Sequence, residues 1–262
     1  MPENRTLLYS AMVLALLTLT ACGGPQPLPT ADPGPRALLE KMAESLAFTQ
    51  TKDLNTPGHV RIPLAKGQWI TTLTRYVNPD GDIILSTTRV IEVQGDTVTL
   101  EVESHAASQN GQPNLTLVQI AGYPTQLPLG PDKETMKTLH RQMRILRMAT
   151  RTGDGQTMEM PSAYLQFGAH RIPDFINPGL RTTPISTQPV DTPYIRARDA
   201  KVFDVEISLP GIRSTGRIHV HGGIPIHNQI LYENEDLVMH TIAYDLKGAQ
   251  QTLFFSTDTP PF

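Results

Sequence analysis

The sequence is nearly free of cysteine, with Cys22 as the one thiol in 262 residues. A disulfide within the chain is therefore excluded, and packing and hydrogen bonds must hold the fold together. Zinc sites that need two or four cysteines, and catalysis by a thiol in a folded site, are excluded for the same reason. The lone cysteine needs another explanation, which its position in the chain supplies.

The chain also lacks a strong charge of one sign and the common catalytic motifs. Its formal net charge is −3, which gives no electrostatic support for binding nucleic acid. Neither the GxSxG pattern of serine hydrolases nor the HExxH pattern of zinc peptidases is present. Ser104 and His105 are adjacent in an expected strand, so they point to opposite faces and cannot act as nucleophile and base. We expect a protein that is not an enzyme, needs no cofactor and has no nucleic-acid partner.

The apolar run near the start of the chain is too short to cross a bilayer. Residues 6–20 follow Arg5 and contain no charge, but they number only 15. A membrane-spanning helix needs about 20 apolar residues. A positive start followed by a short apolar run is typical of a secretory signal peptide.

Cys22 ends this run directly after Leu19, Thr20 and Ala21, a pattern that resembles the lipobox of bacterial lipoproteins. The resemblance implies that residues 1–21 are a lipoprotein signal peptide and that Cys22 carries diacylglycerol and an N-terminal acyl chain. Two or more acyl chains hold a protein stably at a membrane. Because Gly23 stands where an aspartate would signal inner-membrane retention, the resemblance favours the outer membrane, facing the periplasm of a Gram-negative host. An ordinary signal peptide with an incidental cysteine is the alternative.

Residues 22–34 are rich in proline and glycine, a composition that neither forms a helix nor buries apolar area. We interpret them as a linker between the lipidated cysteine and the folded part, able to span up to ~40 Å when extended. Residues 35–262 are long enough to bury a core and show no solenoid repeat. They predict a single β-rich domain.

The hydrophobic pattern of this domain changes from a helical to an alternating period. Residues 35–49 place Leu38, Leu39, Met42 and Leu46 at helical spacing, which predicts a helix. Alternating segments separated by short turns then predict antiparallel strands. These expected strands cover residues 68–77, 83–93, 97–105, 115–121, 200–209, 214–221, 228–233, 237–245 and 251–256.

Two segments are less regular. We expect residues 132–148 to form a short helix to about Arg141 and then a hairpin, although their later part also fits a strand. Residues 161–197 hold six prolines and predict a long ordered loop. Together the patterns predict an α+β fold, mainly antiparallel β: a curved half-open sheet of about nine or ten strands with an N-terminal helix and a long Pro-rich loop. In the clearly alternating strand we expect one buried and one solvated face, with Glu101 and Glu103 in solvent.

Four histidines form the main candidate metal site in the sequence. His219 and His221 are two residues apart in an expected strand, which places both imidazoles on one face. His227 and His240 lie on neighbouring expected strands, so the four could contribute to a zinc, copper or iron site. Paired histidines on strand faces are common without a metal, so a metal-binding module is an alternative and no metal is favoured.

The order of elements carries a second resemblance. A helix and a four-stranded meander precede a C-terminal pattern, made of Ile218-His219, Gly223-Ile224-Pro225-Ile226, Ile230-Leu231-Tyr232-Glu233, Val238 and Ala243-Tyr244. This arrangement resembles uncharacterised bacterial secreted and lipoprotein domains. These are similar in turn to the carrier and receptor family of lipoprotein localisation (Lol type). The resemblance implies a curved half-open antiparallel sheet with helices as a lid, which binds acyl chains.

We therefore expect a membrane-anchored, non-enzymatic envelope lipoprotein whose concave sheet holds an apolar ligand or a partner lipoprotein. The candidate lining of that cavity is Ile70, Val98, Leu100, Val102, Phe203 and Val205. An anchored interaction or structural domain without a small ligand is the alternative that the sequence does not separate from it. The expected partners are the membrane, through the lipid anchor, and a lipid or a protein.

Overall fold

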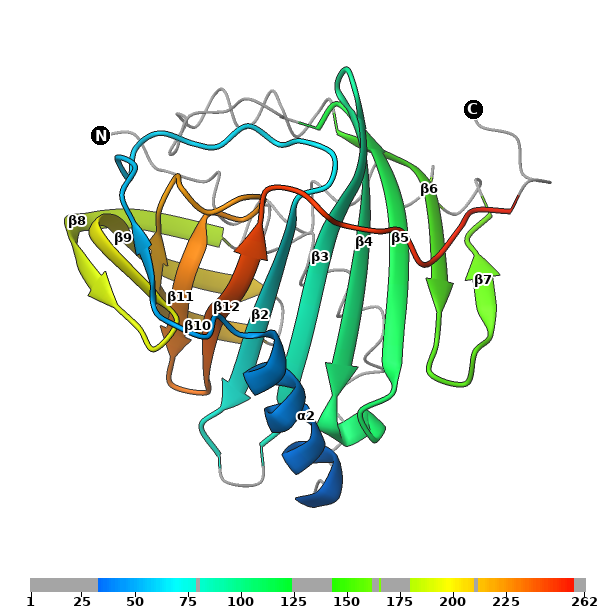
Figure 1. Ribbon diagram of the computed structural model, residues 1–262, viewed down its shortest axis with the longest axis horizontal. Coiled ribbons are helices and arrows are strands. Elements are labelled where there is room, and N and C mark those ends of the chain that lie inside the picture. The colour runs from blue at the N-terminus through cyan, green and yellow to red at the C-terminus, as the bar shows by residue number, and fades with distance from the viewer. Residues whose placement is uncertain are drawn as a thin grey trace.

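The structure is a computed structural model, and it describes residues 33–78, 81–123, 143–161, 165, 180–209 and 212–256. Within these residues one α-helix precedes a sheet of twelve strands, drawn in Figure 1. The helix is α2 (Pro33–Leu46), and a short 3-10 helix, η1 (Ala107–Gln109), follows the fourth strand. The strands are β1 (Lys52–Leu54), β2 (Trp69–Tyr76), β3 (Ile83–Gln94), β4 (Thr97–Ala106), β5 (Pro113–Ala121), β6 (Arg144–Arg151), β7 (Thr157–Glu159), β8 (Leu180–Asp191), β9 (Ile195–Leu209), β10 (Ile212–Val220), β11 (Gln229–Asn234) and β12 (Leu237–Asp245).

The expected fold class is confirmed: the sheet is open, mainly antiparallel and preceded by a helix. Its strand order is β1-β9-β10-β11-β12-β2-β3-β4-β5-β6-β7, with β8 paired to β9, and β1 pairs with β9 in parallel. The expected hairpin after residue 142 is confirmed as β6 and β7, while the expected helix up to Arg141 lies outside the described residues. The sheet has more than the expected nine or ten strands because β1, with three residues, is too short for a visible alternation, and β8 lies in a segment expected as a loop.

The sheet consists of two antiparallel runs that meet where β12 pairs with β2. Residues of the two strands face each other from Leu237 and Tyr76 to Asp245 and Trp69, with one bulge in β12. Figure 1 shows this junction in the middle of the sheet, with β2–β7 on one side and β8–β12 on the other. The second strand and the last strand of the chain are therefore neighbours at the centre of the sheet.

The expectation of a loop over residues 161–197 is wrong for its last part, which forms β8 and the start of β9. Strand β8 pairs only with β9, and its ladder shifts register at Pro184 and again between Gln188 and Val190, across Pro189. Proline cannot donate a ladder hydrogen bond and is tolerated at bulges and on edge strands. The prolines that suggested a loop are thus accommodated at the edge of the sheet, where they also discourage pairing with another chain.

Both faces of the central strands are buried, which corrects the expectation of one solvated face. We name the face that carries Ile70, Val98 and Leu100 the valine face, and the face that carries Leu73 and Leu85 the helix face. On the helix face, Leu39 and Ala43 of α2 pack against Leu73, Leu85, Ile83 and Ile242. The valine face belongs to a separate and larger apolar cluster.

Glu101 is fully buried on the helix face, so its expected place in solvent is wrong. Its carboxylate lies 3.2 Å from Arg89 Nη1 and accepts hydrogen bonds from the backbone N–H groups of Thr252 and Leu253, at 2.8 and 2.7 Å. Residues 251–256, expected as a strand, instead cross the sheet as an extended segment (red in Figure 1). The carboxylate of Glu101 takes the place of a ladder partner for two of their amides.

We predict that Glu101→Gln lowers the free energy of unfolding by about 3 kcal/mol, because one member of a buried ion pair is lost. Urea denaturation of the variant and of the wild type measures this difference. Glu44→Gln, on the exposed side of α2, is the matched control and is expected to change stability by less than about 0.5 kcal/mol. Equal stability of the two variants would contradict the role given to Glu101.

Candidate functional site

The six candidate lining residues share one face of the sheet but do not line an open groove. The ladder register places Phe203 opposite Ile218, and Ile218 opposite Tyr232, on the face that also carries Ile70. Every one of the six is at most 4% exposed. They are Ile70, Val98, Leu100, Val102, Phe203 and Val205. A ligand on this face would have to displace residues that cover it.

Two connections between strands supply part of that cover. Leu64, from the connection between β1 and β2, packs in the same cluster as Val98 and Leu100. Ile224 and Ile226, from the connection between β10 and β11, are at most 1% exposed and belong to it as well. Because α2 packs on the helix face, it contributes nothing to closing the valine face.

The four histidines do not converge. Among the residues described, no group of three His, Cys, Asp or Glu side chains is placed to hold a metal ion. A register shift between His219 and Val220 ends the alternation, so His219 and His221 have different neighbours. His219 lies 3.7 Å from Glu233, and the ring of His240 packs edge-on against Tyr194. Burial lowers the pKa of both imidazoles.

His221 joins the two connections that cover the valine face. Its Nε2–H donates to Asp199 Oδ1 at 3.2 Å, and its Nδ1 accepts the Gly223 N–H at 3.0 Å. Asp199 also accepts the Gly58 N–H at 2.8 Å, so one carboxylate holds a residue of each connection. Burial lowers the pKa of His221, which keeps the ring neutral as this hydrogen-bond pattern requires.

Gly222 lets the two connections approach closely. Its N–H donates to the Gly58 carbonyl at 2.9 Å, and its own carbonyl accepts the Ile62 N–H at 3.0 Å. A Cβ at Gly222 would overlap the carbonyl of Val60. The two connections therefore form one layer, held by backbone contacts that only glycine permits at this position.

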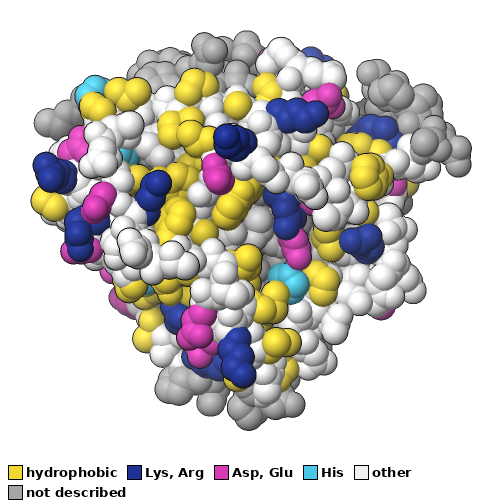
Figure 2. All heavy atoms as spheres, viewed as in Figure 1, with side chains coloured by type: hydrophobic (Ala, Val, Ile, Leu, Met, Phe, Trp, Pro, Cys, Tyr) yellow, Lys and Arg dark blue, Asp and Glu magenta, His cyan; other side chains and the backbone are white. Residues whose placement is uncertain are grey.

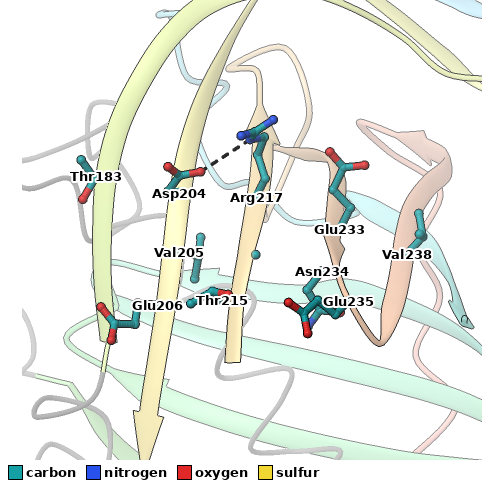
Figure 3. Close-up of a pocket in the computed structure, with 11 residues that line it drawn as sticks. Thr183, Asp204, Val205, Glu206, Thr215, Arg217, Glu233, Asn234, Glu235 and Val238 are labelled. Carbon is teal, nitrogen blue, oxygen red and sulfur yellow. Dashed lines mark ion pairs between the residues drawn. The ribbon is translucent and has the colours of Figure 1, made fainter. Parts of the chain in front are cut away.

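A hollow of about 800 Å³ lies over strands β8–β12. Figure 3 shows polar side chains along it, with Arg217 pointing toward Asp204, to which it is 3.5 Å away. Glu206, Glu233 and Glu235 add three further carboxylates. Of the candidate lining residues only Val205 borders it, so this hollow is a polar surface and not the expected apolar cavity.

A network of charges lies on the helix face around Glu103. The expectation that Glu103 is solvated is wrong, because its carboxylate is partly buried and paired. Arg89 Nη2 approaches Glu103 to 2.5 Å, and His105 Nε2 lies 2.9 Å from the same carboxylate. His105 Nδ1 lies 2.9 Å from the Gly111 carbonyl. Both ring nitrogens face acceptors, so the doubly protonated ring satisfies both. The bond to Glu103 raises the pKa of His105, and the same bond lowers the pKa of Glu103 to about 2. In Figure 2, viewed onto this face, basic and acidic groups alternate around hydrophobic side chains.

The comparisons with known proteins give one weak likeness. Neither a protein-family model nor the sequence of a characterised protein matches this chain. The chain is similar to a solved structure from Bacteroides fragilis, named as having a YmcC-like fold and thought to be exported. The likeness covers 71% of this chain and 99% of the other at 10% identity, with a TM-score of 0.32. A likeness at this level carries no argument about the fold or the function.

In the part of the chain that the structure describes, no helix has the length and hydropathy needed to span a membrane. Sequence reasoning missed Arg61 and Asp199, whose contacts join residues more than a hundred positions apart. No spacing in the sequence points to either residue. The one local signal is the Gly222-Gly223 pair, which marks a close backbone approach.

We predict a pH-dependent contribution of His105 to stability. Because its pKa is raised on folding, the contribution is complete below the unfolded value of about 6.5 and disappears as the pH rises through the folded value. The contribution of Glu103 runs the other way, since its pKa is lowered: it is present above about pH 4.3 and is lost as the pH falls toward 2.

The difference in free energy of unfolding between the wild type and His105→Gln should therefore be largest between about pH 4.5 and 6.5. Chemical denaturation at pH 5.5 and pH 8.5 measures it. A difference that is unchanged or larger at pH 8.5 would contradict the raised pKa of His105.

Proposed function

We propose that this protein is a lipid-anchored bacterial envelope protein that acts by binding and not by catalysis. The lipobox-like sequence ending at Cys22 supports anchoring by acyl chains, and residues 22–34 support a spacer between membrane and domain. Gly23 in place of an aspartate supports an outer-membrane position facing the periplasm in a Gram-negative host. The partners in this role are the membrane and one bound ligand.

The ligand is an apolar chain, from a lipid or from a partner lipoprotein, held against the valine face. The observation that carries this proposal is that the two faces of the sheet are covered by different kinds of element, a helix on one and strand connections on the other. Helix α2 covers the helix face, whereas described residues of two strand connections, including Leu64, Ile224 and Ile226, lie on the valine face. Connections outside a ladder open at a lower free-energy cost than core strands do. An acyl chain can replace the contacts of these three side chains with Val98 and Leu100.

A second role, as an anchored interaction domain without a small ligand, is favoured by the hollow over β8–β12. Its acidic lining, with Glu206, Glu233 and Glu235, suits the basic surface of another protein. This role needs no movement of the connections. An apolar ligand should stay with the protein on purification, whereas an interaction domain should be purified without one.

We predict that Cys22→Ser abolishes acylation and releases the protein from membranes, because its anchor is then missing. Metabolic labelling with an alkyne analogue of palmitate, followed by membrane fractionation, measures both effects. Thr20→Ser keeps a small residue before the cysteine and is the matched control, expected to label like the wild type. An unlabelled wild-type protein would instead support an ordinary signal peptide.

We predict that the full-length protein, purified gently in dodecyl maltoside, carries an apolar molecule beyond its covalent anchor. Solvent extraction and mass spectrometry identify it. Leu100→Ala enlarges the space on the valine face and should change the chain length of the bound molecule. Leu85→Ala removes the same atoms from the helix face, with a similar cost of about 2–5 kcal/mol, and should leave the bound molecule unchanged. A wild-type protein without extractable ligand would contradict this role and leave the interaction domain.

A further inference from the structure

The connection between β10 and β11 contains strained backbone around His227. Ile226 has a φ of 63° and Asn228 a φ of 56°, both in the left-handed region. Asparagine adopts this region readily, but for a β-branched side chain such as isoleucine it is a genuine outlier. Strain of this kind persists only where the surrounding contacts impose it. The contacts that impose this conformation involve the ring of His227 and the side chain of Arg61.

The turn places the ring of His227 inside the protein. The ring is 5% exposed, and its Nε2 lies 3.4 Å from the hydroxyl of Thr88 on the valine face. Its Nδ1 is buried without a hydrogen-bond partner. A buried polar atom without a partner carries a desolvation cost, and in a native structure it calls for an explanation. Burial and the nearby charge of Arg61 together lower the pKa of His227 to about 3.

Arg61 is a partly buried cation without a counter-charge. Its Nη2 donates to the carbonyl of Ile226 at 3.4 Å, and no carboxylate pairs with it among the described residues. Burial lowers the pKa of the guanidinium, and Tyr123 is the one neighbour that acts to raise it. A guanidinium removed from water normally pairs with a carboxylate or a phosphate, which its planar fork fits. Its contact with the Ile226 carbonyl is the one hydrogen bond of this guanidinium among the described residues.

We propose that Arg61, with the ring of His227 beside it, forms a binding site for an anionic group, a carboxylate or a phosphate. Arg61 supplies the charge, and the neutral His227 offers a hydrogen bond from Nδ1 or accepts one from a protonated ligand. The strain at Ile226 is explained because this backbone conformation turns the Ile226 carbonyl to Arg61 and the ring of His227 inward.

The site adjoins the apolar cluster of the valine face. Ile226, whose carbonyl accepts from Arg61, belongs to that cluster, and so do Leu64 and Tyr123. An amphiphile with an anionic head could therefore place its head at Arg61 and its chain against Val98 and Leu100. In this form the inference deepens the proposed function and rests on it. A free anion would use the same donors without the chain.

Isothermal titration calorimetry of the full-length protein in dodecyl maltoside distinguishes an anionic amphiphile from a free anion as the ligand. The probes are inorganic phosphate, which has the head alone, and monododecyl phosphate, which has head and chain; the detergent supplies the same chain with a neutral head. We expect monododecyl phosphate to bind and Arg61→Gln to weaken its binding about tenfold or more, with Arg61→Lys in between. Lys66→Gln removes an exposed cation from the same connection and should bind like the wild type.

Each outcome decides a different point. Equal binding by the wild type and Arg61→Gln overturns the anion site but leaves the apolar ligand in place. Phosphate alone binding as tightly as monododecyl phosphate, and depending on Arg61, supports the site and counts against the apolar chain. Binding of neither probe overturns the site.

A readout on the unaltered protein guards against variants that fail to fold. Burial is the main cause of the low pKa of His227 and the charge of Arg61 adds to it, so an anion that offsets this charge should raise the pKa from about 3. NMR of the labelled imidazole follows this change during titration with phosphate and with monododecyl phosphate. A ring signal and pKa unaffected by saturating amounts of both probes would overturn the proposal.

Discussion

The antiparallel ladder between β2 and β12 brings together two strands that lie about 160 residues apart, and the remaining strands extend the sheet from this junction. One run continues through β3 to β7 and the other through β11 to β8. The ladder places Ile70 beside Tyr244 and Leu73 beside His240, so it also decides which side chains share a face. The elements that cover each face, α2 on one and the strand connections on the other, depend on this register.

The two faces are closed by different kinds of contact. On the helix face, Glu101 accepts two amides of the C-terminal segment, and Arg147 holds the end of that segment through the Ser256 carbonyl at 2.8 Å. On the valine face, the covering connections are joined to each other through the backbone of Gly222, and Asp199 of β9 binds Gly58 of one and His221 of the other. A layer that is joined internally can move as one unit, which makes the valine face the side at which a ligand could enter.

Local patterns predicted the long strands because alternation within each strand reflects its own two faces. The same patterns failed where structure depends on distant residues. The alternation around Glu101 predicts a solvated residue, but Thr252, 151 positions away, packs against it. Arg61 likewise donates to the carbonyl of Ile226, which lies 165 positions away. Strand β8 was obscured by prolines that only an edge position tolerates. The six candidate lining residues share one face, yet the residues that cover this face could not be predicted, since they lie in connections without periodicity.

We propose that a ligand enters beneath the two connections on the valine face. Hydrogen exchange with mass spectrometry on the full-length protein, with and without monododecyl phosphate, measures which segments respond to binding. Amides of residues 55–68 and 221–228 are expected to change their exchange rates, while those of α2 and of residues 251–256 on the helix face are not. A change confined to the helix face or to the hollow over β8–β12, with the two connections unaltered, would contradict it.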